Sequence, residues 1–188
     1  MRVIGGSLKG RKIEIPINKS TRPLKDMVRE SIFNIIEHSN KENIELANSK
    51  ILDLFSGIGS FGIECLSRGA EEVFFFENYN NSLKILKKNV HSLNLENKCR
   101  ISEKDIYQIN ENDFGKNNFD LIFLDPPFDD DKLATLIVSI KKLKIFTEKT
   151  LIIIHRNKKT EDKIPSFFKI IREENYGLSK IIFGKIII

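Results

Sequence analysis

From Lys50 onward, short apolar runs alternate with segments of helical periodicity, and this alternation limits the possible fold more than any other feature of the sequence. The apolar runs predict strands at 51–55, 72–76, 99–101, 119–124 and 151–154, and the helical segments fall at 60–68, 80–93 and 131–145. Two more strands fit near 167–172 and 180–187, as an antiparallel hairpin that turns at Tyr176-Gly177. Strands that alternate with helices lie parallel and are covered on both faces. The sequence therefore predicts an α/β fold with a mostly parallel sheet.

The N-terminal segment, residues 1–45, has a different pattern, so we expect an extension there and a sheet domain over 46–188. Glycines and an alternation of polar and apolar residues predict a hairpin within 2–15. Pro23 is placed to begin a helix, in which apolar residues repeat every four positions. The polar stretch 39–49 is expected to be a linker.

The charge of the chain is concentrated in this extension. The net charge is +5, and residues 1–30 hold eight basic and three acidic residues, whereas the other 158 residues hold 23 of each sign. A basic end on a neutral body is typical of a segment that contacts phosphates, although a solvated lysine-rich surface has the same composition. The residues expected to contact nucleic acid are Arg2, Lys9, Arg11, Lys12, Arg22, Lys25 and Arg29.

Other classes of protein fit the sequence poorly. No apolar run approaches the roughly 20 residues that cross a bilayer, and the N-terminus lacks the apolar core of a signal peptide. Cys65 and Cys99 lie in apolar stretches, which favours free thiols over a disulfide. No residues have metal-ligand spacing, no Ser-His-Asp set is apparent, and His155 is expected to make only local hydrogen bonds. We expect a cytoplasmic protein without a membrane segment or a metal.

A glycine-rich segment lies between the first strand of the sheet and the helix that follows it. Glycines stand at 57, 59 and 62, after the acidic strand residue Asp53. Gly57 and Gly59 let the backbone approach a ligand closely, and ligands of open parallel sheets bind outside the carboxyl ends of the strands. A tight turn needed only for packing is the alternative.

Two more carboxylates follow neighbouring strands. Glu77 comes 18 residues after Gly59, where it can accept hydrogen bonds from the ribose hydroxyls of an adenosine or of NAD. Asp105 follows the third strand, where it can accept a hydrogen bond from an adenine amino group while an apolar neighbour covers the ring. A solvated surface carboxylate is the alternative at each position.

The tetrapeptide Asp125-Pro126-Pro127-Phe128, directly after the strand 119–124, indicates the chemistry. Asp125 and the Pro126 carbonyl can each accept one N–H of an amino group on a nucleic-acid base. That arrangement turns the nitrogen lone pair toward a sulfonium methyl group, so catalysis would be mainly orientation with electrostatic support. Phe128 can stack on the base, which must leave its helical stack to enter the pocket. A rigid turn after a strand is the alternative.

Five stretches of the sequence together resemble a known family along nearly the whole chain. They are Arg2-Val3-Ile4-Gly5-Gly6 with Gly10-Arg11-Lys12, Thr21-Arg22-Pro23 with 28–34, residues 53–70, Asp125-Pro126-Pro127-Phe128, and Tyr176-Gly177. The sequence thereby resembles the bacterial 16S ribosomal RNA guanine-N2 methyltransferases of the RsmD type. The tetrapeptide alone is shared with DNA amino-methyltransferases, and the N-terminal stretches make the resemblance more specific.

The resemblance implies a class I S-adenosylmethionine-dependent methyltransferase fold, a Rossmann-like seven-stranded sheet with an N-terminal hairpin-plus-helix extension that contacts RNA. The implied S-adenosyl-L-methionine site comprises Asp53, Phe55, Gly57, Gly59, Glu77, Asn78, Asp105 and Ile106. The implied catalytic residues, which hold the target guanine, are Asp125, Pro126, Pro127 and Phe128. The implied substrate is 16S rRNA within the small ribosomal subunit or its assembly intermediate, and we expect the enzyme to be a monomer.

Some positions depart from the family pattern, and other functions remain possible at this point. The departures are Leu24, Lys25, Met27, Asn78-Tyr79 and His155, the last of which stands where an acidic residue is common. A DNA adenine amino-methyltransferase would normally need an additional target-recognition segment. An NAD-dependent oxidoreductase would leave the Asp125 motif unexplained. A non-catalytic RNA-binding assembly factor would have no use for that motif.

Overall fold

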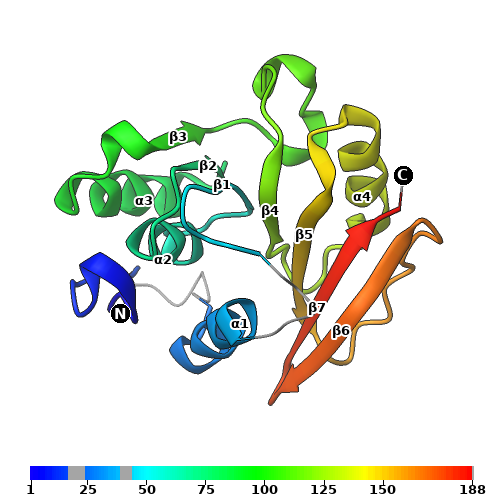
Figure 1. The fold of residues 1–188 in the computed structure, drawn as a ribbon, viewed down its shortest axis with the longest axis horizontal. Helices are drawn as coiled ribbons and strands as arrows, with labels where there is room; N and C mark the ends of the chain where they lie inside the picture. The colour runs from blue at the N-terminus through cyan, green and yellow to red at the C-terminus, as the bar shows by residue number, and fades with distance from the viewer. Residues whose placement is uncertain (17–23, 39–43, 188) are drawn as a thin grey trace.

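A computed structural model describes residues 1–16, 24–38 and 44–187, and its centre is a seven-stranded sheet (Figure 1). The strands are β1 (Lys50–Leu54), β2 (Glu72–Phe76), β3 (Cys99–Ser102), β4 (Phe119–Leu124), β5 (Phe146–Asn157), β6 (Phe168–Tyr176) and β7 (Ser179–Ile186). Their order across the sheet is β3-β2-β1-β4-β5-β7-β6. The first five strands are parallel, and β7 is antiparallel to both of its neighbours. The predicted α/β class and the antiparallel hairpin at the end of the chain are confirmed.

Helices cover both faces of this sheet. They are α1 (Asp26–His38), α2 (Ser60–Ser67), α3 (Asn80–Ser92) and α4 (Leu133–Leu143), and the short 3₁₀ turns are η1 (Gly6–Leu8), η2 (Glu96–Lys98), η3 (Ile106–Gln108) and η4 (Glu111–Asp113). Apolar side chains of α1, α2 and α3 form one core with alternate strand residues such as Ile51, and α4 forms a second core with residues such as Leu52. The predicted stripe of Val28, Ile32 and Ile36 is buried in the first core.

The boundaries of some elements differ from those that the sequence predicted. β5 was expected over 151–154 but extends from Phe146 to Asn157. Its pairing with β4 shifts register between Phe119 and Leu121, and its far end pairs with β7 up to the Asn157–Ser179 pair. Partner strands therefore lengthen β5 beyond its apolar run, because a polar residue can still join the hydrogen-bond ladder.

The N-terminal segment folds back on itself and packs into the core of the sheet domain. Arg2 and Lys12 form an antiparallel bridge, and the Gly10 amide donates to the Val3 carbonyl at 2.9 Å. Val3 is 2% exposed and Ile13 is fully buried. The predicted hairpin is therefore present as a short turn, and its core is continuous with that of the sheet. The predicted helix start at Pro23 and much of the expected linker lie outside the described residues.

The arrangement of β1 and β4 determines where a ligand can bind. The chain passes from β1 to β2 and β3 on one side, and then returns to place β4 on the other side of β1. The carboxyl ends of β1 and β4 are therefore adjacent, with Leu54 paired to Leu124. The Asp125 amide continues this pairing by donating to the Leu54 carbonyl at 3.3 Å. Such a switch point in an open α/β sheet is the usual position of a ligand site.

Candidate functional site

The glycine-rich segment between β1 and α2 is held by two carboxylates. One oxygen of Asp53 accepts a hydrogen bond from the Gly62 amide at 3.0 Å. Glu77 accepts from the Gly57 amide and from the Tyr79 amide, each at 2.7 Å. Glu77 therefore joins the glycine segment to the end of β2.

Gly59 is required by its surroundings, and Gly57 leaves room at the surface of the loop. Gly59 has a φ of 80° at the N-terminus of α2, and a Cβ atom there would lie 2.4 Å from Leu86 Cδ1. Gly57 has a φ of 56°, and a Cβ there would meet no atom within 4 Å. The backbone at Gly57 is thus open to a ligand, which agrees with the reason for expecting a glycine at that position.

Phe55 is held in an unusual backbone conformation beside this segment. Its φ is 61°, in the left-handed region that aromatic residues rarely adopt. Its ring centroid lies 6.2 Å from that of Tyr107. Backbone conformations of this kind cost free energy and concentrate at binding sites, where surrounding contacts maintain them.

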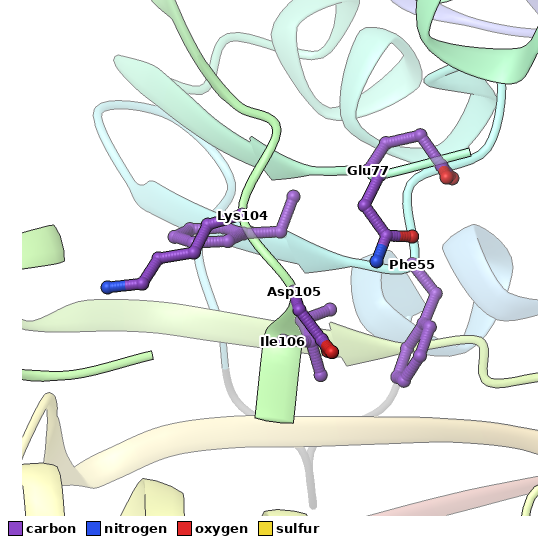
Figure 2. Close-up of a pocket in the computed structure, with 7 residues that line it drawn as sticks. Phe55, Glu77, Lys104, Asp105 and Ile106 are labelled. Atoms are coloured by element: carbon purple, nitrogen blue, oxygen red, sulfur yellow. The ribbon is translucent and has the colours of Figure 1, made fainter. Parts of the chain in front are cut away.

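A pocket opens next to Phe55 at the carboxyl ends of β1, β2 and β3 (Figure 2). Its lining residues are Phe55, Phe76, Glu77, Asn78, Lys104, Asp105 and Ile106. Five of them are among the eight residues expected at the cofactor site, whereas Phe76 and Lys104 were not predicted. The ammonium group of Lys104 pairs with Asp113 at 2.7 Å. The pocket thus combines carboxylate acceptors with an aromatic and an aliphatic side chain.

Asp53 lies beneath the pocket rather than in its wall. The residue is 1% exposed, and its Oδ1 atom accepts no hydrogen bond within the part of the chain that the structure describes. Burial raises the pKa of Asp53 well above its usual value, and the charges of Asp125 and Glu77 add to this, while the Gly62 amide opposes it. Asp53 therefore positions the glycine segment, and its expected contact with the cofactor stays a prediction.

Glu77 is also removed from water to a considerable extent. Burial raises its pKa, and the hydrogen bonds from the backbone amides of Tyr79, Gly57 and Asn78 oppose that effect. The Gly57 amide donates to one carboxylate oxygen and the Tyr79 amide to the other. Two carboxylate oxygens together have about four acceptor sites, so these three bonds leave one free. Glu77 can therefore hold the loop and still accept from a ligand hydroxyl.

The segment 125–132, which we call the target loop, follows β4 and begins with the Asp125 motif. Pro126 is buried, Pro127 is exposed and Phe128 is half-buried. The Asp130 amide donates to the Pro127 carbonyl at 3.0 Å and closes the turn. Among the described residues, none donates a hydrogen bond to the Pro126 carbonyl, which is free to accept one from a ligand.

A buried arginine that the sequence reasoning missed holds the target loop. Arg156 is fully buried at the end of β5. Its guanidinium donates to the Pro127 carbonyl at 2.8 Å and to the Asp130 carbonyl at 2.6 Å, and it pairs with Asp162 at 2.9 Å. The hydroxyl of Tyr107 donates to the Asp130 carboxylate at 2.6 Å. The loop is therefore fixed both from β5 and from the side of the pocket.

His155 and Ser179 form a hydrogen-bonded chain with Asp125. Nδ1 of His155 lies 2.7 Å from Asp125 Oδ1, and its Nε2 lies 2.8 Å from Ser179 Oγ. This arrangement could not be predicted from the sequence, because His155 is 30 positions from Asp125 and 24 from Ser179. The expectation that no Ser-His-Asp set exists was therefore wrong, and His155 is not limited to local contacts.

The basic residues that were expected to contact nucleic acid divide into two groups. Arg2, Lys9, Arg11, Lys12 and Lys25 are exposed. Arg22 lies outside the described residues. Arg29 is fully buried, and burial lowers its pKa. The prediction that Arg29 contacts RNA is corrected, because its side chain lies inside the protein.

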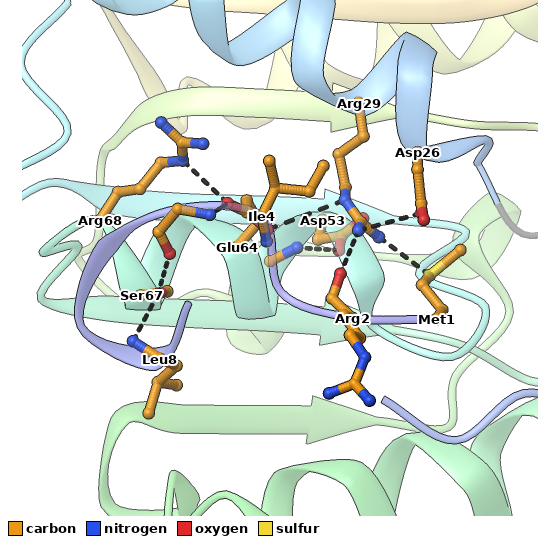
Figure 3. A network of polar contacts seen from close by, with 12 residues as sticks. Met1, Arg2, Ile4, Leu8, Asp26, Arg29, Asp53, Glu64, Ser67 and Arg68 are labelled. Atoms are coloured by element: carbon orange, nitrogen blue, oxygen red, sulfur yellow. Dashed lines mark hydrogen bonds and ion pairs between the residues drawn. The ribbon is translucent and has the colours of Figure 1, made fainter. Parts of the chain in front are cut away.

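Arg29 belongs to a buried network centred on Glu64 (Figure 3). Glu64 accepts from the amides of Ile4 and Gly5 at 2.8 and 2.7 Å. It also pairs with Arg68 at 3.0 Å and lies 3.8 Å from Arg29 Nε. Arg29 in turn donates to the Arg2 carbonyl at 2.6 Å. The network therefore ties the N-terminal turn to α1 and α2.

The described residues also concern metal binding, membrane insertion and the two cysteines. Among them, no group of three or more His, Cys, Asp or Glu side chains is arranged to hold a metal ion. None of the helices in the described ranges is both long and apolar enough to cross a bilayer. Cys65 is buried and Cys99 is half-buried, and both thiols are free.

The chain is similar in sequence to several known proteins. It matches the family described as Conserved hypothetical protein 95 over residues 1–185. YlbH of Bacillus subtilis, provisionally named an rRNA methyltransferase, is 33% identical over 98% of each chain. Ribosomal RNA small subunit methyltransferase D of Buchnera aphidicola is 30% identical over 87% of this chain and 81% of its own. The protein of that name from Haemophilus influenzae is 35% identical over 68% of this chain and 64% of its own.

Solved structures have the same fold along the whole chain. The Escherichia coli protein yhhF, provisionally named a methyltransferase, has a TM-score of 0.80 at 23% identity, covering 100% of this chain and 98% of its own. The Haemophilus influenzae methylase HI0767, also named provisionally, has a TM-score of 0.78 at 25% identity, with the same coverage. The seven-stranded sheet with its helices is therefore the class I S-adenosylmethionine-dependent methyltransferase fold. The match over residues 1–185 and the relatives of 30% identity or more show that this chain belongs to the RsmD family of 16S rRNA methyltransferases.

Proposed function

We propose that the chain transfers the methyl group of S-adenosyl-L-methionine to N2 of one guanine in 16S rRNA of the small ribosomal subunit. One observation carries the proposal. The Asp125 carboxylate and the Pro126 carbonyl, which has no donor among the described residues, follow β4, and β4 is hydrogen-bonded to β1, the strand that leads into the glycine segment. Two acceptors for an amino group thus lie next to a pocket suited to an adenosine.

The residues of the pocket fit S-adenosyl-L-methionine. Phe55 and Ile106 offer apolar walls for an adenine, and the Asp105 carboxylate can accept from its amino group. Glu77 can accept from the ribose hydroxyls, and the open backbone at Gly57 leaves room for the rest of the ligand. The cofactor, when bound, supplies an electrophilic methyl group on a sulfonium.

The protein's own residues orient the amino group of the base. Asp125 and the Pro126 carbonyl each accept one N–H, so the nitrogen lone pair is directed away from both acceptors. Phe128, whose ring is half-buried, stacks on the base and keeps it in the pocket. The methylated nitrogen must then lose a proton, and Asp125 is the acceptor already in contact with it. Orientation of this kind can supply a large part of the rate acceleration.

The exposed cations of the N-terminal segment would contact the RNA backbone. Lys9, Arg11 and Lys12 lie around the turn that packs against α2 and α3 (Figure 1). Phosphate contacts set the position of a protein on nucleic acid without reading its sequence. We propose that the intact small subunit or an assembly intermediate presents the guanine to a cytoplasmic, monomeric enzyme.

Methyl transfer to three substrates tests the proposal. Labelled S-adenosyl-L-methionine is supplied with small subunits that lack the modification, with deproteinised 16S rRNA or with duplex DNA, and the products are digested to nucleosides. We expect N2-methylguanosine from the subunits. Methyladenine from DNA would agree with the role proposed for the Asp125 motif but would contradict the proposed rRNA substrate. Binding of NAD in place of S-adenosylhomocysteine would contradict the proposal that S-adenosyl-L-methionine is the cofactor.

Substitution of Asp125 tests the assignment of the amino group. We expect Asp125→Ala to lower turnover by at least about a thousandfold, because the loss of orientation and of a charged acceptor acts on the transition state. Binding of S-adenosylhomocysteine, measured by calorimetry, should be unchanged. Asp129→Ala, at an exposed position of the same loop, is the matched control and should remain active. An equal loss of cofactor affinity in Asp125→Ala would show that its role is misassigned.

A further inference from the structure

We infer that His155 is a positioning residue that holds both Asp125 and Phe128 in the orientation needed to bind the target base. The inference rests on the proposed function, because it concerns how these two residues are held. Asp125 directly follows β4, His155 lies near the end of β5, and Ser179 begins β7. The three adjacent strands therefore bring one polar side chain each to the same edge of the sheet.

The contacts of the His155 ring leave it little freedom. The residue is 6% exposed and Ser179 is 9% exposed, whereas the side chain of Asp125 keeps 23% of its surface in contact with solvent. The two ring nitrogens are 2.7 Å from Asp125 Oδ1 and 2.8 Å from Ser179 Oγ. The ring also packs edge-on against Phe128, with centroids 5.5 Å apart and planes at 77°. One imidazole thus contacts both residues assigned to the base.

The hydrogen-bond chain has a direction. Asp125 as a carboxylate only accepts, so Nδ1 of His155 donates to it. In the neutral ring Nε2 then has a free lone pair, and the Ser179 hydroxyl donates to that lone pair. Asp125 thereby fixes the tautomer, the Ser179 hydroxyl adapts to it, and His155 donates to Asp125 Oδ1. The other oxygen, Oδ2, has no partner among the described residues and remains available for the amino group.

The same three residue types also form the catalytic triad of serine hydrolases, but the burial differs from what that chemistry needs. A serine nucleophile must reach the carbonyl carbon of its substrate. Ser179 is nearly buried, at the start of a strand that pairs with β5 on one side and β6 on the other. Asp125 is the most exposed of the three hydrogen-bonded residues. Its carboxylate, rather than the Ser179 hydroxyl, is therefore the group that can contact a base.

Three substitutions at His155 separate positioning from simple packing. His155→Asn places its amide nitrogen near the position of Nδ1 and can still donate to Asp125. His155→Gln reaches the position of Nε2, next to Ser179, and His155→Phe keeps the ring without any donor. We expect kcat to fall about 10- to 100-fold in the Gln and Phe variants, because a hydrogen bond to a charged group is lost, and less than about threefold in Asn. KM for S-adenosylmethionine should stay within about twofold in all three.

One control and one spectroscopic measurement complete the experiment. His91→Phe changes a histidine whose side chain is 83% exposed, on α3, and should leave kcat unchanged. In ¹⁵N-labelled protein, the His155 Nδ1 proton should give a resonance protected from exchange, and Asp125→Ala should abolish it. Loss of that resonance needs no enzyme activity, so it can be measured in any folded variant.

The outcomes distinguish this inference from the proposed function. Full activity of Asp125→Ala would overturn the proposed function itself. An inactive Asp125→Ala together with a wild-type kcat in His155→Phe would overturn the inference alone. Equal losses in the Asn, Gln and Phe variants, accompanied by equal losses of thermal stability, would also overturn it, because they would assign His155 to packing only.

Discussion

At the scale of single residues, this protein keeps charged groups in places where water is excluded. Asp53, Glu64, Arg29 and Arg156 are all at most 1% exposed. Asp53 Oδ1 and Arg29 Nε have no hydrogen-bond partner among the described residues, although Arg29 Nε lies 3.8 Å from Glu64. A buried polar atom of this kind costs folding free energy, and at Asp53 the cost falls on the residue that positions the glycine segment.

Asp53→Asn should therefore make the protein without cofactor more stable, and increasingly so at higher pH. The raised pKa of Asp53 means that the folded state favours the protonated form. The resulting stability is fully present below the unfolded pKa and is lost as pH rises through the folded pKa. Asparagine does not titrate, and its carbonyl can still accept from Gly62. Urea unfolding at pH 5 and pH 8 measures the difference, and a gap that shrinks toward pH 8 would contradict the prediction.

The sequence identified residue roles best where they depend on neighbours in the chain. Phe55, Glu77 and Asp105 follow strands, so their position at the pocket could be predicted from strand ends alone. Arg29 could not be placed, because a cation on a helix face looks solvated until Glu64, 35 residues away, is known to lie beside it. Arg156 and His155 follow an apolar run directly, but their partners lie in the target loop and in other segments distant in the sequence.

At the scale of elements, parallel strands fix the site and the side-chain networks hold the elements to one another. Periodicity predicted the strands and helices because each apolar run has a sheet face or a helix stripe to bury. It could not predict that β5 would continue to Asn157, since that extension depends on pairing with β7. It also could not show how the N-terminal turn is attached, because that attachment is made by Glu64 and Ser67 as well as by apolar residues.

Glu64→Gln should loosen the attachment of the N-terminal turn to α2. The variant removes a buried charge that Arg29 and Arg68 face, and the loss of one partner of such a pair costs about 3–5 kcal/mol. Denaturant unfolding measures that cost, and hydrogen exchange at the Ile4 and Gly5 amides should accelerate.

The matched control is Glu37→Gln, which removes the outer partner of Arg68. Its side chain is 35% exposed, so a loss of at most about 1 kcal/mol is expected. Equal losses in the two variants would show that burial does not distinguish these two ion pairs.

At the scale of the whole molecule, the charges form a basic segment on a neutral body. The described cations of that segment surround a turn that the Glu64 network holds in place, so their positions relative to the sheet are fixed. A rigidly placed set of cations can orient a large RNA before the base enters the pocket. Charge counts along the sequence predicted the segment but not its rigid attachment.

Reversal of Lys9, Arg11 and Lys12 to glutamate should weaken binding of small subunits and flatten its dependence on salt. Each phosphate contact that is lost reduces the slope of log affinity against log salt by nearly one. Filter binding at 50–300 mM potassium chloride measures this slope. A matched control replaces Lys116, Lys142 and Lys149 with glutamate. These three lysines are exposed and lie near the N-terminal ends of β4 and β5 in the sequence. The two triple variants should have similar stability, and identical slopes would exclude the N-terminal turn from the interface.

The pairing of β1 with β4 also has a consequence for redesign. Neighbouring strands lie about 4.8 Å apart. The pairing of β1 with β4 therefore sets the distance between the loop that would hold the donor and the target loop. An insertion within either strand would move one loop by about 3.3 Å per residue and turn its side chains to the other face. Replacement of residues 126–132 alone would leave this strand pairing intact. A different target loop could therefore change the base preference, while the loop that would hold the methyl donor is unchanged.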